Sequence, residues 1–298
     1  MAKRKKRGAQ AGNRQVQAQA QRLAAARKVR NRRLLITSVV AVVVAALIGL
    51  VVWQATNVTG PTPPSTDPTS PTTSSTGGMF IPPNGSPDGL YIELASPNVK
   101  ADALVIDEFI DYQCPYCGLL TRMYIGAFDQ LVASGDIIMR VHLRSFLDGG
   151  IPGQNSVRAA TAATCADVVG KFSSYHDVIF ANQPEEGIGY SDEQLRIDFP
   201  RAAGITGPDL TYFRQCYDSE QTRPYVEYME PANSTWMADW SAVNAGGKKF
   251  GTPTLLVNGK LLPLEELVTV SDDGKHYVPA QDTNPTAFLA FLATIAAS

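Results

Sequence analysis

An apolar run of twenty residues, Leu34–Trp53, contains no charged side chain. At about 1.5 Å per residue, a helix of this length spans roughly 30 Å, which is the thickness of a hydrocarbon core. Residues 1–33 contain twelve Lys or Arg and no acidic residue. The positive-inside rule therefore puts this basic tail in the cytoplasm and everything after Trp53 outside, so we expect one transmembrane helix that anchors the chain.

A cleaved signal peptide is the alternative interpretation of the same run. Its apolar core is usually shorter, about 7–15 residues, and small residues precede its cleavage site. Here a cut after Ala55 would put bulky Trp53 at the outer specificity position. The basic tail in isolation suits RNA binding, but beside a membrane span it is better explained as a topology signal that contacts anionic lipid.

Residues 54–88 carry eight prolines and thirteen Ser or Thr residues. A stretch of this composition cannot bury a core, and it is typical of an extended spacer with a rise of about 3.1 Å per residue. We expect it to be a linker between the membrane span and a folded domain that begins at residue 89.

Beyond this linker, the apolar periodicity alternates between strand and helix. A β-branched run predicts a buried strand over residues 103–110, and apolar positions at helical spacing follow until Gly135 stops them. Residues 137–146 predict a second strand. Near the C-terminus, a hairpin turns at Asn258-Gly259, and a last helix begins at Pro285 with Asn284 as its cap.

The middle of the domain is mainly helical in pattern. Helices are predicted at 155–170, 172–182, 191–203, 208–218 and 222–245, with breaks near Pro184, Pro208 and Pro231. Strand, helix, strand, helical block, hairpin and helix together predict an α/β fold over residues 89–298, with a helical insertion at about 150–246.

Charge limits the partners of this domain. Residues 34–298 hold the other 14 of the 26 basic residues and all 28 acidic ones, so their net charge is 14 − 28 = −14. An acidic surface repels phosphate, and nucleic-acid binding by the domain is excluded as a main function.

The candidate chemistry lies in Cys114-Pro115-Tyr116-Cys117, at the junction of the first strand and the first helix. Unpaired N–H groups and the helix dipole at this end favour a negative charge, so the thiol pKa of Cys114 should be lowered and its thiolate available as a nucleophile. Cys117 lies one turn further on, is more buried, and would resolve a mixed disulfide. Pro115 in the first turn loses no hydrogen bond.

The other two cysteines, Cys165 and Cys216, fall in separate helical patterns. An exported location favours a structural disulfide between them, whereas two buried free thiols or a second redox pair are the alternatives. Zinc is disfavoured because these two are 51 residues apart with no nearby partner, and no histidine stands at ligand spacing. We expect no metal.

Glu108 is the acidic candidate. Strand alternation puts it on one face with Leu104, Ile106 and Ile110, and desolvation among aliphatic side chains should raise its pKa. The alternative is a partly exposed glutamate in a surface salt bridge.

In combination, these motifs resemble the DsbA branch of the thioredoxin superfamily over residues 90–297. The resemblance rests on Glu108 six residues before Cys114, the CPYC motif, the helical insertion, the Gly-Thr-Pro-Thr loop at 251–254, and the VNG hairpin with its final helix. The resemblance is also to actinobacterial members, because these carry a similar extra cysteine pair. The implied fold is therefore a thioredoxin-like α/β fold with an inserted helical subdomain, preceded by one transmembrane helix.

The resemblance implies roles for individual residues. Cys114 and Cys117 would exchange disulfides, and Glu108 would relay a proton to and from Cys117. Thr252-Pro253 would form a cis-proline loop whose backbone pairs with a client strand, and Pro115 and Tyr116 would complete the client-binding surface. Strongly oxidising relatives carry histidine where this chain has Tyr116, which supplies no cationic charge, so we expect a milder oxidant.

The expected function is extracytoplasmic disulfide formation in exported, cysteine-containing client proteins. No organic cofactor is needed, since the sulfurs carry the electrons. Turnover as an oxidase needs a membrane reoxidant of the DsbB or vitamin K epoxide reductase-like type. An isomerase or reductase of the same fold is one alternative, and a membrane-tethered chaperone or binding module without turnover is another.

Overall fold

The structure is a computed structural model, and it describes residues 79–298. The predicted basic tail (1–33), the predicted membrane span (34–53) and most of the predicted linker (54–88) lie outside the described residues. Within residues 79–298, no helix combines the length and the apolar character that a membrane crossing requires.

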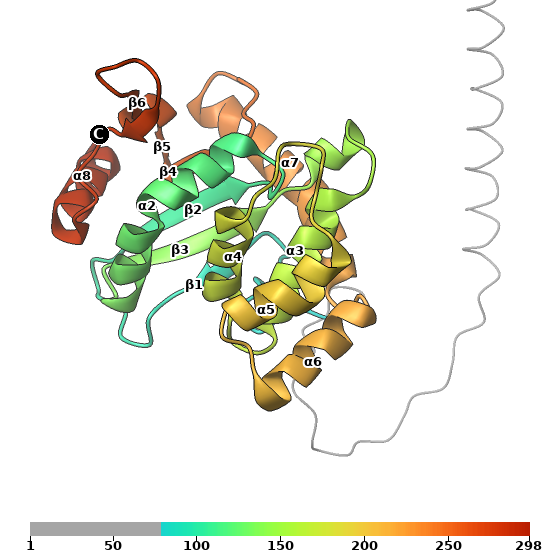
Figure 1. The fold of residues 1–298 in the computed structure, drawn as a ribbon. Helices are drawn as coiled ribbons and strands as arrows, with labels where there is room; N and C mark the ends of the chain where they lie inside the picture. The colour runs from blue at the N-terminus through green and yellow to red at the C-terminus, as the bar shows by residue number, and fades with distance from the viewer. Residues whose placement is uncertain (1–78) are drawn as a thin grey trace, which may run out of the picture. The chain divides into compact units, whose positions relative to one another are not determined.

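A five-stranded mixed sheet forms the centre of the domain (Figure 1). Its strand order is β1-β3-β2-β4-β5, in which only β2 and β3 are parallel. The strands are β1 (Ile92–Leu94), β2 (Leu104–Ile110), β3 (Ile137–Leu143), β4 (Thr254–Val257) and β5 (Lys260–Leu262), and a separate hairpin joins β6 (Val268–Val270) to β7 (Tyr277–Pro279). The predicted strands and the predicted hairpin turn are confirmed, whereas β1, β6 and β7 are too short for periodicity to reveal.

Helices account for most of the remaining chain. They are α2 (Pro115–Ala133), α3 (Asn155–Asp167), α4 (Phe172–Ala181), α5 (Phe199–Ala202), α6 (Gly207–Asp218), α7 (Arg223–Asn244) and α8 (Pro285–Ala297), with short 3-10 turns at Phe146–Gly149 and Leu264–Glu266 and a π-helical turn at Gln194–Asp198. Asn284 caps α8 as predicted, because its side chain accepts hydrogen bonds from the N–H groups of Thr286 and Ala287.

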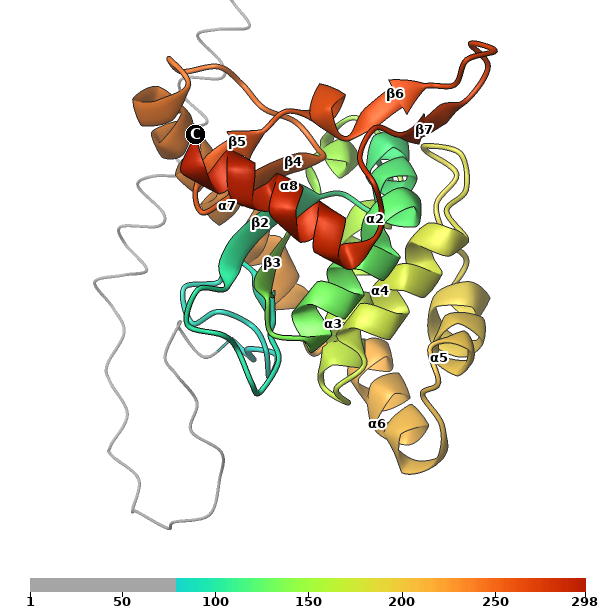
Figure 2. The ribbon, with the colours of Figure 1, turned by 90° about the vertical axis from the view of Figure 1, so that its left-hand side faces the viewer.

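The two faces of the sheet bury different side chains of β2. Ile106 and Ile110 belong to the main core beneath α2 and α8, and Figure 2 shows α8 lying across this face beside α2. On the opposite face, Phe109 packs with Leu256 and with Met237 of α7. Strand alternation therefore puts Glu108 on the face of α2, as predicted.

The helical insertion is confirmed, and α3 to α6 lie to one side of the sheet (Figure 1). The predicted break near Pro231 is wrong, because α7 continues through this proline. A helical proline lacks the N–H that would bond the carbonyl four residues earlier. Here both Pro231 and Glu227 are exposed, so water can reach the freed carbonyl.

The folded domain begins before the predicted boundary at residue 89. Asn84 donates its backbone N–H and its side-chain amide to the carboxylate of Asp167, at 2.8 and 2.7 Å. Ser86 is buried, and Met79 and Ile81 pack against the main core. The Pro/Ser-rich composition of the predicted linker concealed these anchors, so its last residues are part of the domain.

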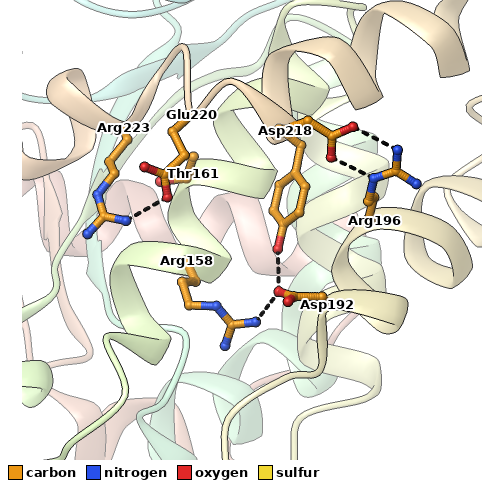
Figure 3. A pocket seen from close by; sticks show the side chains of 8 residues that line it. Arg158, Thr161, Asp192, Arg196, Asp218, Glu220 and Arg223 are labelled. Carbon is orange, nitrogen blue, oxygen red and sulfur yellow. Dashed lines mark hydrogen bonds and ion pairs between the residues drawn. The ribbon is translucent and has the colours of Figure 1, made fainter.

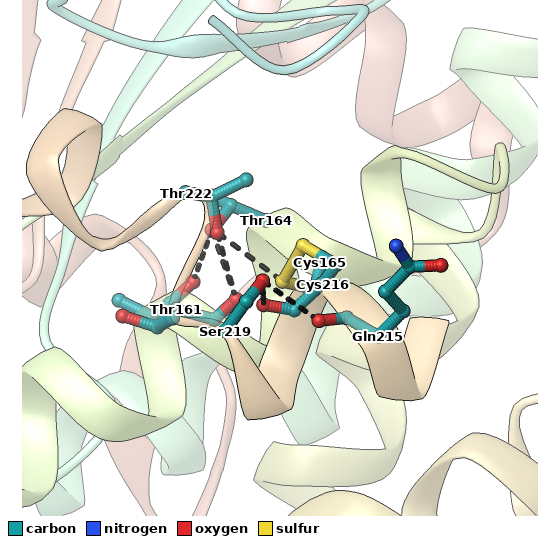
Figure 4. The surroundings of a disulfide bond; sticks show 8 residues. Thr161, Thr164, Cys165, Gln215, Cys216, Ser219 and Thr222 are labelled. Carbon is teal, nitrogen blue, oxygen red and sulfur yellow. Dashed lines mark hydrogen bonds between the residues drawn. A yellow bond between two sulfur atoms is a disulfide. The ribbon is translucent and has the colours of Figure 1, made fainter. Parts of the chain in front are cut away.

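A disulfide between Cys165 and Cys216 joins α3 to α6 (Figure 4). Both cysteines are buried. The hydroxyl of Thr222 accepts a hydrogen bond from Thr164 at 2.8 Å and lies 3.3 Å from the sulfur of Cys165. The bond therefore lies inside the helical insertion, buried in the main core beside these two threonines, as a structural crosslink.

Replacing both Cys165 and Cys216 by alanine should lower the free energy of unfolding by about 2–4 kcal/mol, because the unfolded chain then regains the entropy of an open loop. Urea unfolding followed by circular dichroism measures the change. The reduction potential of Cys114 and Cys117 should stay the same in this variant. An unaltered urea midpoint would contradict a stabilising role for the crosslink.

Candidate active site

The candidate active site forms where β2 ends and α2 begins. A tight turn connects them, in which the backbone N–H of Cys114 donates to the carbonyl of Asp111 at 2.9 Å. Cys114 is the N-cap of α2 in an extended conformation, and Pro115 occupies the first helical position. Proline suits this position because the first residue of a helix has no partner for a backbone N–H, and proline has no N–H to leave unpaired.

Cys114 is chemically the more reactive of the two cysteines in this turn. Its pKa is lowered to about 6, because the thiol of Cys117 donates to its sulfur, with further help from Thr252 and from backbone N–H groups of α2 that outweigh its burial. When protonated, the Cys114 thiol donates a hydrogen bond to the carbonyl oxygen of Thr252 at 3.2 Å. A thiolate is therefore available at neutral pH, although only 6% of the residue is exposed.

Cys117 has the opposite character. It is 1% exposed, and burial together with the neighbouring Cys114 thiolate raises its pKa well above the ordinary value. One cysteine thus holds negative charge easily while its partner, one helical turn away, keeps its proton. Such a pair suits a nucleophile and a resolving thiol.

The loop that faces the pair contains a cis peptide bond between Thr252 and Pro253. This loop lines a groove of about 430 Å³, together with Phe250 and the segment Leu261–Glu265. Beside the cysteines, Tyr116 is 56% exposed, and its ring packs edge-on against Tyr277 of β7, with 6.4 Å between the ring centres. Thr252 lines this groove and also contacts the Cys114 sulfur, so the groove opens beside the cysteine pair.

Glu108 lies under α2 on the face of β2 that the sequence indicates. It is 2% exposed, and one of its carboxylate oxygens has no hydrogen-bond partner within the described chain. Burial raises its pKa to about 7. The surface salt bridge considered as an alternative is therefore wrong, and the carboxyl group can exchange a proton near neutral pH.

Sequence analysis missed a buried polar group at the same turn. Asp111 is fully buried, and burial raises its pKa to about 7 against the opposing hydrogen bonds from Ser156, Gln113 and Leu147. Its only sequence signal is a carboxylate three residues before Cys114, and the partner Ser156 is 45 residues away. No local pattern reveals such a contact.

A second hollow, of about 410 Å³, lies in the helical insertion (Figure 3). Three arginines face it, and each is paired: Arg158 with Asp192, Arg196 with Asp218, and Arg223 with Glu220. The guanidinium charges are thus compensated within the protein, and the Arg196–Asp218 pair joins the π-helical turn to α6. Across residues 79–298, no cluster of three or more His, Cys, Asp or Glu side chains is arranged to hold a metal ion.

A low-pKa cysteine at a helix N-terminus, a buried resolving cysteine and a facing cis-proline loop define a thiol–disulfide exchange site on a thioredoxin-like fold. A family model described as thioredoxin matches residues 99–272, which is more than half of the chain. The chain belongs to this family.

Curated relatives share part of this domain. The chain is 24% identical over 162 residues to a protein of Rickettsia typhi named as a protein-disulfide oxidoreductase, covering 54% of this chain and 53% of that protein. It is 28% identical over 161 residues to the serine/threonine-protein kinase PknE of Mycobacterium tuberculosis, covering 50% of this chain and 25% of the kinase. The match therefore spans about half the length of the first relative and a quarter of the second.

One solved structure extends the comparison to the fold. MdbA, a thiol-disulfide oxidoreductase from Actinomyces oris, is similar with a TM-score of 0.51 at 17% identity, covering 72% of this chain and 89% of that chain. This similarity extends the thioredoxin-like fold over most of the described domain.

Glu108→Gln should change how stability depends on pH. The folded-state pKa of Glu108 is about 7, above its ordinary 4.5, so the wild-type chain loses stability as the pH rises from about 4.5 to about 7. The variant has no ionisable carboxyl at this position, so its stability relative to wild type should rise by about 3 kcal/mol over that interval. Urea unfolding of the oxidised proteins from pH 4 to 8 measures this, and parallel pH profiles would show that Glu108 is not a raised-pKa acid.

Proposed function

We propose that this chain is an extracytoplasmic thiol–disulfide oxidoreductase that oxidises pairs of cysteines in exported proteins. The observation that supports this proposal is the difference between the two cysteines. Cys114 faces the cis-proline loop and has a pKa of about 6, whereas Cys117 is buried and has a raised pKa. The Rickettsia relative and MdbA are both named as disulfide oxidoreductases, which supports the same activity.

The oxidation proceeds in two exchanges. A client thiolate attacks the sulfur of Cys114 in the Cys114–Cys117 disulfide, that bond breaks, and Cys117 leaves as a thiolate that takes up a proton. The second client thiolate then attacks the client sulfur of the mixed disulfide, and Cys114 leaves as a stabilised thiolate. Two electrons have passed from the client to the pair, and the client holds a disulfide.

Glu108 and the cis-proline loop assist these steps in this proposal. Glu108 can supply the proton that Cys117 takes up, because its carboxyl is buried with a pKa of about 7. The Thr252 carbonyl lies 3.2 Å from the Cys114 sulfur, so a client strand that pairs with this loop brings its cysteine next to the sulfur that it attacks. Pro115, Tyr116, Thr252 and Pro253 form the client-binding surface.

Turnover requires an external oxidant, since each client leaves the pair reduced. We propose a membrane reoxidant of the DsbB or vitamin K epoxide reductase-like type, and no organic cofactor. The Cys114 pKa of about 6 supports a moderate oxidant, because the strongest relatives reach about 3.5. Isomerase or reductase activity of the same site is the alternative enzymatic function. A membrane-tethered chaperone without turnover is the non-enzymatic alternative.

Oxidative refolding of a reduced ribonuclease, with glutathione disulfide as terminal oxidant, tests the proposal. Catalytic amounts of the wild-type chain should accelerate recovery of ribonuclease activity, and Cys114→Ser should reduce the rate to the uncatalysed one. Cys117→Ser should accumulate a mixed disulfide with the client, seen on non-reducing gels. Insulin reduction without oxidative refolding would favour a reductase, and refolding equally helped by Cys114→Ser would leave only a chaperone.

We also propose that residues 34–53 anchor the chain in the membrane with the domain outside, and that the basic tail contacts anionic lipid. The apolar run and its flanking charges support this topology. The full-length chain should remain in the membrane pellet after alkaline carbonate extraction, and deletion of residues 34–53 should release it. Digestion of the domain in intact spheroplasts by added protease checks the side, and a mature chain that lacks its first 55 residues by mass would instead indicate a cleaved signal peptide.

A further inference from the structure

A buried polar network connects the active-site turn to the helical insertion. Oδ1 of Asp111 accepts a hydrogen bond from the backbone N–H of Gln113 at 2.9 Å and another from the hydroxyl of Ser156 at 2.6 Å. Its second oxygen faces the N–H of Leu147 at 3.4 Å. One carboxyl group thus contacts the turn before Cys114, the second residue of α3, and the 3-10 turn that follows β3.

A second carboxylate completes this network. Asp148 accepts the backbone N–H groups of Ser156 and Val157, both at 3.0 Å, and so caps the N-terminus of α3. The N-cap residue of α3, Gln154, makes no such side-chain bond itself. The side-chain amide of Gln113 donates to both Asp148 and Ser156 at 2.8 Å, which ties the active-site turn to this cap twice.

The backbone of Asp111 also reaches both cysteines. Its carbonyl accepts the N–H of Cys114 at 2.9 Å, and its backbone N–H acts to lower the pKa of Cys117 against the larger effect of burial. An aspartate that begins a turn and bonds the N–H two residues later holds that turn in one conformation. Any shift of Asp111 therefore moves the turn that places Cys114 at the start of α2.

We propose that Asp111 is a positioning residue for the redox pair, and that the helical insertion holds the active-site turn through its bonds to Ser156 and Gln113. The inference rests on the proposed function, and it assigns to the insertion a part in setting the reduction potential. This positioning role requires an acceptor oxygen at residue 111, because every hydrogen bond to the Asp111 carboxyl comes from an N–H or O–H donor.

Several polar and charged side chains interact with the Asp111 carboxyl group. Asp148 raises the pKa of Asp111 by repulsion, Ser156 and Gln113 lower it by hydrogen bonding, and the Asp111 carboxyl in turn acts on the phenol of Tyr190. Because burial brings the pKa to about 7, an uncharged acceptor can replace the carboxylate without leaving a buried charge unpaired. Asparagine is that replacement.

The test measures the equilibrium of the Cys114–Cys117 pair with glutathione in the full-length chain, by acid quenching and alkylation of these two cysteines. Asp111→Ala should make the pair less oxidising by a factor of about ten in the equilibrium constant, or about 30 mV, because the Cys114 thiolate loses ordered donors. Asp111→Asn should stay within threefold of wild type. Ser156→Ala should shift the constant in the same direction as Asp111→Ala, by at least threefold.

Asp167→Ala is the matched control, since Asp167 is also buried, lies on α3 and accepts two hydrogen bonds, but from Asn84. It should lower stability and leave the constant within twofold of wild type. A constant within twofold of wild type for Asp111→Ala, or an equal shift in Asp167→Ala, overturns the inference. If Asp111→Ala does not fold, Ser156→Ala decides by the same criterion.

The two proposals fail in distinguishable ways. A wild-type pair that never equilibrates with glutathione contradicts the proposed function itself. A wild-type pair that equilibrates, together with unaltered constants in the Asp111→Ala and Ser156→Ala variants, contradicts only the positioning role.

Discussion

The unequal stabilisation of two sulfurs one helical turn apart is the constraint on which this structure depends. Cys114 keeps a thiolate because donors from Cys117, Thr252 and the first turn of α2 converge on it, and Cys117 keeps its proton because it is buried. Donors that stabilise the thiolate stabilise the reduced pair, and a more stable reduced pair makes its disulfide a stronger oxidant. Reactivity and direction of electron flow therefore have the same physical origin.

Building such a site introduces unfavourable groups that the rest of the fold has to offset. Glu108 and Asp111 are both buried acids with pKa values of about 7, and at neutral pH each lowers the stability of the folded state. The continuous core beneath α2 and α8 and the Cys165–Cys216 crosslink contribute in the other direction. Strongly perturbed acids tend to gather at functional sites, and here both stand within six residues of Cys114.

Local patterns predict this fold where the determinants are local. The strand before Cys114, the capped start of α8 and the turn at Asn258-Gly259 each depend on neighbouring residues, and all three are confirmed. Long-range contacts are different, because the partner of Asp111 is Ser156 and the partner of Asn84 is Asp167. Pro231 illustrates the converse, since α7 buries one face along its length and continues through this local helix-breaking signal at an exposed position.

The residue between the cysteines shows how the site reaches its thiol pKa without a local cation. Tyr116 points to solvent and packs on Tyr277, so its ring brings no positive charge to the Cys114 sulfur. Neutral donors from the Cys117 thiol and the backbone of α2 remain, and salt screens these short-range bonds much less than it screens a surface charge. They also do not titrate between pH 5 and 8, as a histidine would. The redox behaviour of this pair therefore depends mainly on the geometry of the turn, which is why the contacts that hold Asp111 matter for it.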